Sequence, residues 1–194
     1  MKQKREQTMK IIGITGKSGS GKSTLTKLLS ERWQCNSVNI DKIGHRATSN
    51  EEISKKLCKI FGNEILGKDN TIDRKELGNI VFSCKEKMDI LTEITWGYMQ
   101  EILDETLKKE SKTIILEWAL LPSSKYWEKC DIKILIQAND EERKEKVMQR
   151  DHISEEYFLK RDSRSIDYTL YEFDYVFNND YKLETMGKII NTIK

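Results

Sequence analysis

Short apolar runs alternate along the chain with longer segments in which apolar residues recur every three or four positions. The opening run, KIIGIT, is rich in β-branched residues and predicts a strand over residues 10–15. After a glycine-rich stretch, apolar residues recur at helical spacing, at Leu25, Leu28, Leu29 and Trp33. The first part of the chain is therefore expected to fold as strand, loop and amphipathic helix.

The same alternation continues to the end of the chain. Further strands are expected at SVNID, which ends on Asp41, and at residues 112–121, 131–138 and 174–180. Continuous Ile and Leu content in the runs 112–121 and 131–138 is typical of central strands that are buried on both faces. Helices are expected at residues 49–62, 71–82, about 83–109, 140–164 and 183–194. Strands separated by helices throughout predict an α/β fold with a parallel sheet and right-handed crossovers.

Capping residues and helical spacing define three of these helices more closely. Ser49 or Asn50 caps the helix that Gly62 ends, and Asp73 caps the next one. Gly97 offers a position for a kink in the long helix. The inward faces are expected to contain Ile53, Leu57, Ile60 and Phe61, and then Met88, Leu91, Ile94, Tyr98, Ile102 and Leu107.

Composition limits the size of the fold and the class of partner. With 194 residues the chain is expected to form one domain, 1–194, as a monomer or weak oligomer. Its 34 basic and 32 acidic side chains leave a net charge of only +2, which argues against general binding to nucleic acid or to a membrane surface. Any anion site must therefore be local.

The cysteines and the N-terminal segment bear on location. The four cysteines lie far apart without a CxxC pair, so neither a zinc site nor a disulfide framework is expected. No apolar run approaches the ~20 residues that span a bilayer, and residues 1–10 lack the apolar segment of a secretion signal. We expect a cytoplasmic protein whose basic N-terminus is a solvated tail.

Residues 16–24, GKSGSGKST, contain the complete pattern GxxxxGK[ST] between an apolar run and an amphipathic helix. Glycines let backbone amides approach phosphate oxygens, and the positive end of the following helix faces the same site. Lys22 is expected to reach the β- and γ-phosphates of ATP, and the Ser23 hydroxyl to ligate Mg²⁺. The alternative is a glycine-rich turn with an exposed lysine. The expected ATP-binding residues are Gly16, Lys17, Ser18, Gly19, Ser20, Gly21, Lys22, Ser23 and Thr24.

The rest of the chain favours phosphoryl transfer over other uses of a nucleotide. It lacks the NKxD segment of guanine-reading GTPases, and motor and transporter ATPases are usually much longer. A short chain with a basic helical segment at 140–164 suits a small-molecule kinase whose lid excludes water.

Two carboxylates stand where parallel strands are expected to end, which is the edge at which such sheets bind ligands. Asp41 could accept the proton of an attacking hydroxyl or orient a metal-bound water; alternatively, it caps the next helix. Glu117 could hold the Mg²⁺ shell through water; alternatively, it pairs with a lysine.

Cations recur on one helical face at Arg143, Lys146 and Arg150, and further arginines follow on the next helix. Such a cluster could neutralise charge on a transferred phosphoryl group, but interleaved acidic residues leave open a solvated, salt-bridged helix. His45 is either a substrate contact or a surface side chain. The four tryptophans are assigned no role.

Several segments resemble the dephospho-coenzyme A kinase family in order and spacing: IIGITGKSGSGKST, VNIDKIGHRA, FGNEIL, DNTIDRKELGNIVF, LTEIT and KVMQRDHISEEYFLKR. The segment IDRKELGNIVF is much more specific than the P-loop motif alone. The resemblance covers most of residues 10–180 and implies a three-layer P-loop NTPase fold, with a five-stranded parallel sheet flanked by helices. It also implies a helical acceptor-binding region at about 45–112 and a lid at about 140–166.

The activity that the resemblance implies is MgATP-dependent phosphorylation of the ribose 3′-hydroxyl of dephospho-coenzyme A, the last step of coenzyme A synthesis. The resemblance implies that Asp41 is the base and that Lys22 and Arg150 are further catalytic residues. It places Thr15, His45 and Arg74 on the acceptor side. Arg150 is also implied to be a lid arginine, together with Arg161.

The chain departs from the family pattern at a few positions. Trp96 and Gly97 replace a His-Pro pair, and Lys146 replaces the first lid arginine. Glu117 stands where an aspartate is usual, and the glutamine expected after Arg161 is replaced near Ser165. Two other hypotheses therefore stay open: a nucleoside or nucleotide kinase with a different acceptor, and a regulator that binds ATP without transferring phosphate.

Overall fold

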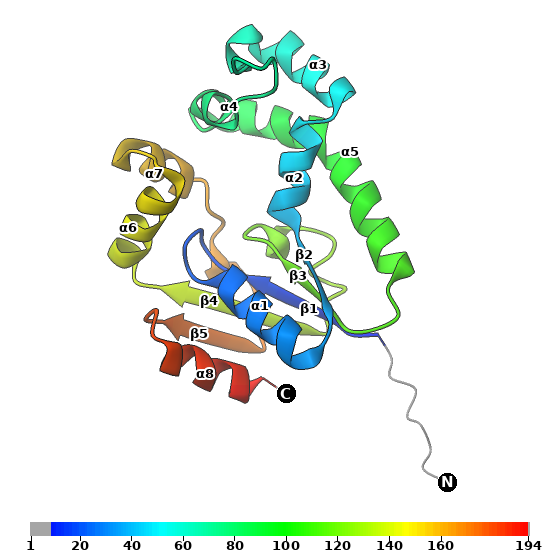
Figure 1. The fold of residues 1–194 in the computed structure, drawn as a ribbon, viewed down its shortest axis with the longest axis vertical. Helices are drawn as coiled ribbons and strands as arrows, with labels where there is room; N and C mark the ends of the chain where they lie inside the picture. Colours follow the sequence, from blue (N-terminus) through cyan, green and yellow to red (C-terminus); the bar gives the residue numbers. More distant parts are fainter. Residues whose placement is uncertain (1–8, 194) are drawn as a thin grey trace. The chain divides into compact units, whose positions relative to one another are not determined.

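The computed structural model describes residues 9–193, so positions 1–8 of the expected N-terminal tail lie outside the described residues. Five strands form one sheet in the order β2-β3-β1-β4-β5, and every pairing is parallel (Figure 1). The strands are β1 (Ile11–Thr15), β2 (Asn36–Asn39), β3 (Ile114–Glu117), β4 (Ile132–Ala138) and β5 (Tyr175–Asn179). The expected parallel α/β fold is confirmed, and β3 and β4 are interior strands, as their apolar runs predicted.

Helices alternate with these strands along the chain. The α-helices are α1 (Lys22–Trp33), α2 (Ile40–Thr48), α3 (Glu51–Phe61), α4 (Arg74–Val81), α5 (Lys85–Lys109), α6 (Asp140–Asp151), α7 (Glu155–Asp162) and α8 (Leu183–Thr192). Short 3-10 helices are η1 (Asn63–Ile65), η2 (Leu121–Ser123) and η3 (Tyr168–Leu170). The charged segment 140–164 thus forms two helices, and α2 is a helix that the apolar pattern did not predict.

The chain divides into two compact units. Within the described residues, the first unit comprises 9–39, 109–158 and 165–193 and contains the sheet. The second unit comprises 40–108 and 159–164 and is helical. The P-loop and its strand belong to the first unit, whereas Asp41 belongs to the second.

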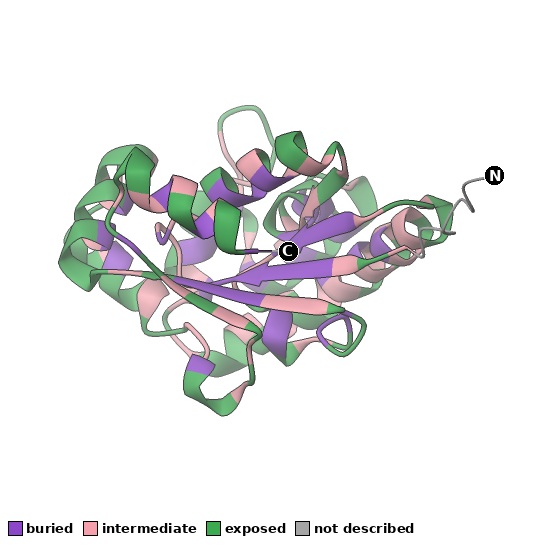
Figure 2. Cartoon of the chain, turned by 90° about the horizontal axis from the view of Figure 1, so that it is seen from below, coloured by how far each residue is buried: buried purple, intermediate pink, exposed green. Residues whose placement is uncertain are grey.

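Both faces of the sheet are covered within the first unit. On one face, Ile12 and Ile14 of β1 pack with Leu25 of α1 and Met186 of α8 in a single buried cluster. On the other, a Cβ added to Gly13 would lie only 2.8 Å from the Sγ of Cys130 and 2.9 Å from the Trp127 ring. The central strands are accordingly buried over much of their length (Figure 2).

The second strand ends earlier than SVNID predicted. β2 is an edge strand whose pairing with β3 runs from Asn36 to Asn39, opposite the last residue of β3, Glu117. Beyond Asn39 the backbone has no further partner in that ladder, and the chain turns into α2. Asp41 is therefore the second residue of a helix and not the last residue of a strand.

Local capping signals were predicted well. The Asn50 side chain accepts hydrogen bonds from the amides of Glu52 and Ile53, so Asn50 and not Ser49 caps α3. Asp73 caps α4 in the same way. The expected inward position of Ile60 is wrong, since 52% of that residue is exposed. Ile60 lies at the edge of the buried stripe of α3, which is formed by Ile53, Leu57 and Phe61.

The buried stripe of α5 is shifted from the predicted one. The buried residues are Thr95, Met99 and Leu103, whereas the six apolar residues expected to face inward are only half-buried. Burial of Thr95 is tolerated because its hydroxyl donates a hydrogen bond to the carbonyl oxygen of Leu91 at 2.8 Å. The helix continues without interruption through Gly97.

Among residues 9–193, no helix combines the length and the apolar character needed to cross a membrane.

Candidate active site

The P-loop joins β1 to α1 at the carboxyl edge of the sheet. Gly16, Gly19 and Gly21 have φ angles of 143°, 84° and 102°, which residues with a Cβ rarely adopt. Space excludes a Cβ as well, because one on Gly16 would lie 2.0 Å from the Ile136 carbonyl oxygen. A Cβ on Gly21 would lie 2.3 Å from Nδ2 of the Asn179 side chain. These glycines are therefore required by the shape of the loop.

Lys22, the first residue of α1, folds back over the loop. Its Nζ donates a hydrogen bond to the Lys17 carbonyl oxygen at 3.0 Å, and only 7% of the residue is exposed. The alternative of a turn with an exposed lysine is therefore wrong. An ammonium held beside backbone amides at a helix N-terminus creates a local site for a polyphosphate on a chain of low net charge.

Ser23 and Glu117 meet where β3 ends. The Ser23 hydroxyl donates a hydrogen bond to Glu117 Oε1 at 2.5 Å, and Glu117 is only 3% exposed. No lysine pairs with Glu117 within residues 9–193, so the alternative reading of this carboxylate is wrong. A hydroxyl and a carboxylate oxygen are ligands that suit Mg²⁺, which takes few protein ligands and keeps several waters.

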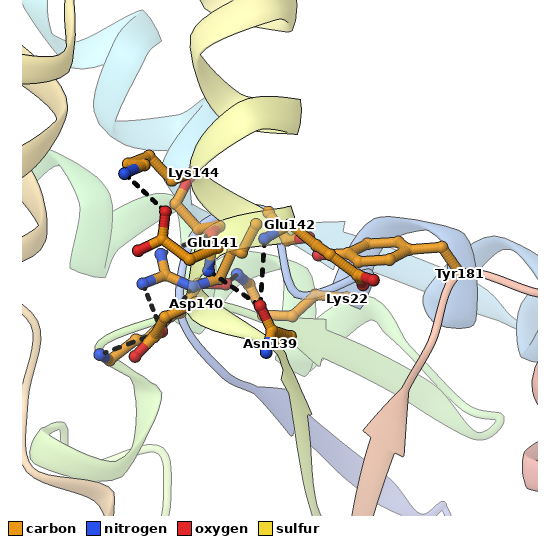
Figure 3. Close-up of polar contacts among 11 residues, drawn as sticks. Lys22, Asn139, Asp140, Glu141, Glu142, Lys144 and Tyr181 are labelled. Carbon is orange, nitrogen blue, oxygen red and sulfur yellow. Dashed lines mark hydrogen bonds and ion pairs between the residues drawn. The ribbon is translucent and has the colours of Figure 1, made fainter.

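Three cations of α6 contact the P-loop or a residue that bonds to it. Arg143, 1% exposed, donates from Nη1 to the Ser18 carbonyl oxygen at 3.0 Å. Arg150 Nη2 lies 3.5 Å from the Ser18 hydroxyl and also pairs with Asp151. Lys146 Nζ lies 4.4 Å from the centre of the Tyr181 ring. The alternative of a solvated, salt-bridged helix holds for Lys144, which pairs with Glu141 (Figure 3) and also with Glu155.

A cavity of about 560 Å³ opens beside the loop within the first unit. Five segments line it: the P-loop, the end of β4, the start of α6, the start of η3 and the end of β5 with the residue after it. Its polar lining includes Lys17, Asn139, Asp140, Asn178 and Asp180. The cavity is therefore large and polar enough to receive part of a nucleotide next to the phosphate-binding loop.

The other expected site residues occupy different positions. Thr15 is fully buried, and its hydroxyl donates to the Ala119 carbonyl oxygen at 3.1 Å. Thr24 is an exposed residue of α1. The remaining four belong to the second unit: Asp41 and His45 are exposed on α2, Arg74 is exposed at the start of α4, and Arg161 is half-buried on α7. Their catalytic and substrate-binding roles stay predictions.

Two residues at the P-loop were not expected from the sequence. Asn179 Nδ2 donates to the Ser20 carbonyl oxygen at 3.0 Å, and the Tyr181 hydroxyl donates to the Gly19 carbonyl oxygen at 2.9 Å. Both follow or end the last strand, at the sheet edge where ligands bind in parallel α/β folds. Their place at the end of the last predicted strand was the signal in the sequence that could have marked them as site residues.

Comparison with known proteins adds independent information. The model of the dephospho-CoA kinase family matches residues 10–184. The dephospho-CoA kinase of Dehalococcoides mccartyi is 31% identical over 191 residues, which cover 95% of this chain and 96% of that relative.

Solved structures agree. The crystal structure of TT1252 from Thermus thermophilus has a TM-score of 0.76 at 28% identity and covers 95% of this chain and 96% of its own. The dephospho-CoA kinase from Campylobacter jejuni has a TM-score of 0.56 at 28% identity, covering 94% and 96%. With a P-loop of the expected geometry and a family match over most of its length, the chain belongs to the dephospho-CoA kinase family of ATP-dependent P-loop kinases.

Proposed function

We propose that this protein transfers the γ-phosphoryl group of MgATP to the ribose 3′-hydroxyl of dephospho-coenzyme A. The observation that carries the proposal is the P-loop, with buried Lys22 at its mouth, in a chain that belongs to the dephospho-CoA kinase family. The specific segment IDRKELGNIVF, which forms the start and body of α4, supports the choice of acceptor.

The first unit binds the phosphates in this proposal. The amides of the loop and the Lys22 ammonium hold the β- and γ-phosphate oxygens. Ser23 and Glu117 fit a magnesium site, because their oxygens lie 2.5 Å apart and one of them is a buried carboxylate. Ser23 would ligate the ion directly and Glu117 through water; when bound, Mg²⁺ would neutralise charge on the transferred group.

The transfer itself needs a base and cations. The Asp41 carboxylate accepts the proton of the acceptor hydroxyl as that oxygen bonds the γ-phosphorus. The bond between the γ-phosphorus and the oxygen that bridges to the β-phosphate breaks, and ADP leaves with the electron pair. Arg150, already within 3.5 Å of the P-loop Ser18 hydroxyl, and Arg161 neutralise charge on the phosphoryl oxygens.

The second unit supplies the acceptor side. Asp41, His45 and Arg74 all belong to it and are exposed, as contacts to an incoming substrate require. The segment from α6 to α7 acts as the lid. A cytoplasmic location fits the four cysteines, all of which are free thiols.

An acceptor screen tests the proposal. Purified protein with MgATP is offered dephospho-coenzyme A, a panel of nucleosides and nucleoside monophosphates, and no acceptor, and ADP release is followed in a coupled assay. We expect ADP release with dephospho-coenzyme A and loss of turnover by more than a hundredfold in Lys22→Ala. Lys27→Ala is the matched control, since Lys27 is an exposed lysine of the same helix. Equal turnover by Lys22→Ala and the parent would contradict the mechanism.

Departures from the family pattern favour testing a second class of acceptor. Trp96, Gly97 and Glu117 depart from the usual family pattern. Phosphorylation confined to a nucleoside or nucleoside monophosphate would identify a kinase with another acceptor. Tight ATP binding without product from any acceptor would identify a regulator.

A further inference from the structure

Three consecutive carbonyl groups of the P-loop, those of residues 18 to 20, accept hydrogen bonds from side chains far away in the sequence. The donors are Arg143 Nη1 to Ser18, the Tyr181 hydroxyl to Gly19 and Asn179 Nδ2 to Ser20, at 3.0, 2.9 and 3.0 Å. Two of them follow each other closely at the end of β5, and the third comes from α6. We call these three donors the carbonyl clamp.

The carbonyl clamp sets the direction of the loop amides. In a trans peptide the C=O and N–H groups point in opposite directions, and no peptide bond in the described residues is cis. Holding the carbonyls of residues 18 to 20 therefore turns the amides of residues 19 to 21 to the other side. The Ser20 amide shows which side this is, because it donates to the Lys17 carbonyl oxygen, which also accepts from the Lys22 ammonium. The Ser20 amide thus lies on the side of the loop where the Lys22 ammonium is held.

The Arg143 guanidinium is held in place by further contacts besides its hydrogen bond to the loop. It is 1% exposed, and its guanidinium also donates to Asp140 Oδ1 from Nε and Nη2, at 3.2 and 2.8 Å. Its guanidinium carbon lies 5.3 Å from the centre of the Phe158 ring. The hydrogen bond from Arg143 holds the pKa of Asp140 below its ordinary value, so the carboxylate stays charged. Lys17, another P-loop residue, lies 3.7 Å from the same carboxylate.

Asn179 and Tyr181 support each other. The Tyr181 amide donates to Asn179 Oδ1 at 2.9 Å, which orients the Asn179 NH₂ group toward the loop. Tyr181 has a φ of 61°, a conformation that non-glycine residues rarely adopt. The Lys146 Nζ lies 4.4 Å from the centre of the Tyr181 ring. The strained backbone of this turn is therefore tied to a contact with the P-loop.

We propose that Arg143, Asn179 and Tyr181 are positioning residues for phosphoryl transfer, which hold the P-loop carbonyls so that its amides are aligned before ATP arrives. A loop containing three glycines has wide conformational freedom, and binding a polyphosphate would otherwise have to order it. Donors that are already aligned stabilise developing charge without reorganisation. The inference deepens the proposed function at its ATP site and rests on it only for the identity of the acceptor.

The test uses the single-atom variant Tyr181→Phe, which removes the hydroxyl and keeps the ring beneath Lys146. Tyr175→Phe is the matched control, because it removes a tyrosine hydroxyl at the start of β5, whereas Tyr181 follows the end of that strand. We expect Tyr181→Phe to weaken MgATP binding in calorimetry, and to lower kcat/KM for ATP, by about five- to tenfold. The KM for dephospho-coenzyme A should not change. Tyr175→Phe should match the parent in all three measurements.

A second pair of variants separates an effect on ATP binding from a general loss of folding stability. Arg143→Lys keeps a cation but cannot bond the Ser18 carbonyl and Asp140 together as the planar guanidinium does, and Arg143→Gln loses the charge as well. We expect an intermediate defect in ATP kinetics for Arg143→Lys and a larger one for Arg143→Gln. Variants whose melting temperature falls while MgATP affinity and kcat/KM for ATP stay at the parent values would overturn the inference.

The two proposals can fail separately. If the parent phosphorylates dephospho-coenzyme A and Tyr181→Phe binds MgATP as the parent does, the positioning inference is wrong and the proposed function stands. If the parent turns over no dephospho-coenzyme A but Tyr181→Phe still binds MgATP more weakly than Tyr175→Phe, the acceptor is wrong and the positioning inference stands.

Discussion

At the scale of single residues, the proposed magnesium ligands are the most direct link between sequence and chemistry. Ser23 belongs to the motif, whereas Glu117 lies 94 positions later and is brought to it by the pairing of β1 with β3. Burial of a carboxylate is costly unless it has a partner. Within the described residues, the Ser23 hydroxyl is the partner that Glu117 has, and a bound cation would be a stronger one.

Glu117→Gln tests this role. The amide keeps the size of the side chain but loses the negative charge that would hold the water shell of the ion. We expect the Mg²⁺ concentration for half-maximal activity to rise about tenfold or more. Glu128→Gln, a change at an exposed residue of the loop after β3, should leave it unchanged. An unaltered Mg²⁺ titration in Glu117→Gln would remove Glu117 from the metal site.

At the scale of elements, the start of α3 depends on contacts between residues two and three positions apart. Asn50 accepts two amide hydrogen bonds at the start of α3, at 3.1 and 3.2 Å. These amides would otherwise lack an intrahelical partner. Such a cap contributes a measurable part of the stability of a helix that is only three turns long.

Asn50→Ala should therefore destabilise the protein by about 1 kcal/mol. For a chain of this length the melting temperature should fall by roughly 2–4 °C, measured by circular dichroism. Asn50→Asp is the control, since its carboxylate accepts the same hydrogen bonds and its charge suits a helix N-terminus. A melting temperature in Asn50→Ala equal to that of Asn50→Asp would show that the cap contributes nothing.

At the scale of the whole molecule, ligand binding and stability are linked. A ligand that binds only the folded chain stabilises it, by about 2.7 kcal/mol at a hundred times its dissociation constant. The P-loop contacts both β4, through Ile136, and the end of β5, through Asn179, so polyphosphate binding acts on the packed sheet unit.

Saturating MgADP should therefore raise the melting temperature of the parent by roughly 5–10 °C. Lys22→Ala should lose most of this shift, because the ammonium that faces the phosphates is gone. Lys27→Ala should keep it, since Lys27 is exposed and lies 4.0 Å from Glu31 on the surface of α1. A full shift in Lys22→Ala would mean that the nucleotide binds elsewhere.

The sequence by itself determined what depends on neighbouring residues. The P-loop motif, the alternation of strands and helices, and the caps at Asn50 and Asp73 are all local, because their hydrogen bonds and glycine conformations involve residues a few positions apart. The central place of β3 and β4 was also predictable, since strands buried on both faces must be apolar throughout.

Only the tertiary structure decided what depends on distant contacts. β2 ends at Asn39 because β3 ends opposite it, at Glu117. The register between two strands cannot be predicted from the sequence of either strand alone. The contacts of Arg143, Asn179 and Tyr181 with the P-loop span 125 to 162 positions. The helical row of cations marked Arg143 in the sequence, but not its contact with the Ser18 carbonyl oxygen. No local pattern marks Asn179 or Tyr181, because a side chain that bonds a backbone carbonyl can be of many types. The fold brings them together by placing the carboxyl ends of parallel strands at one edge.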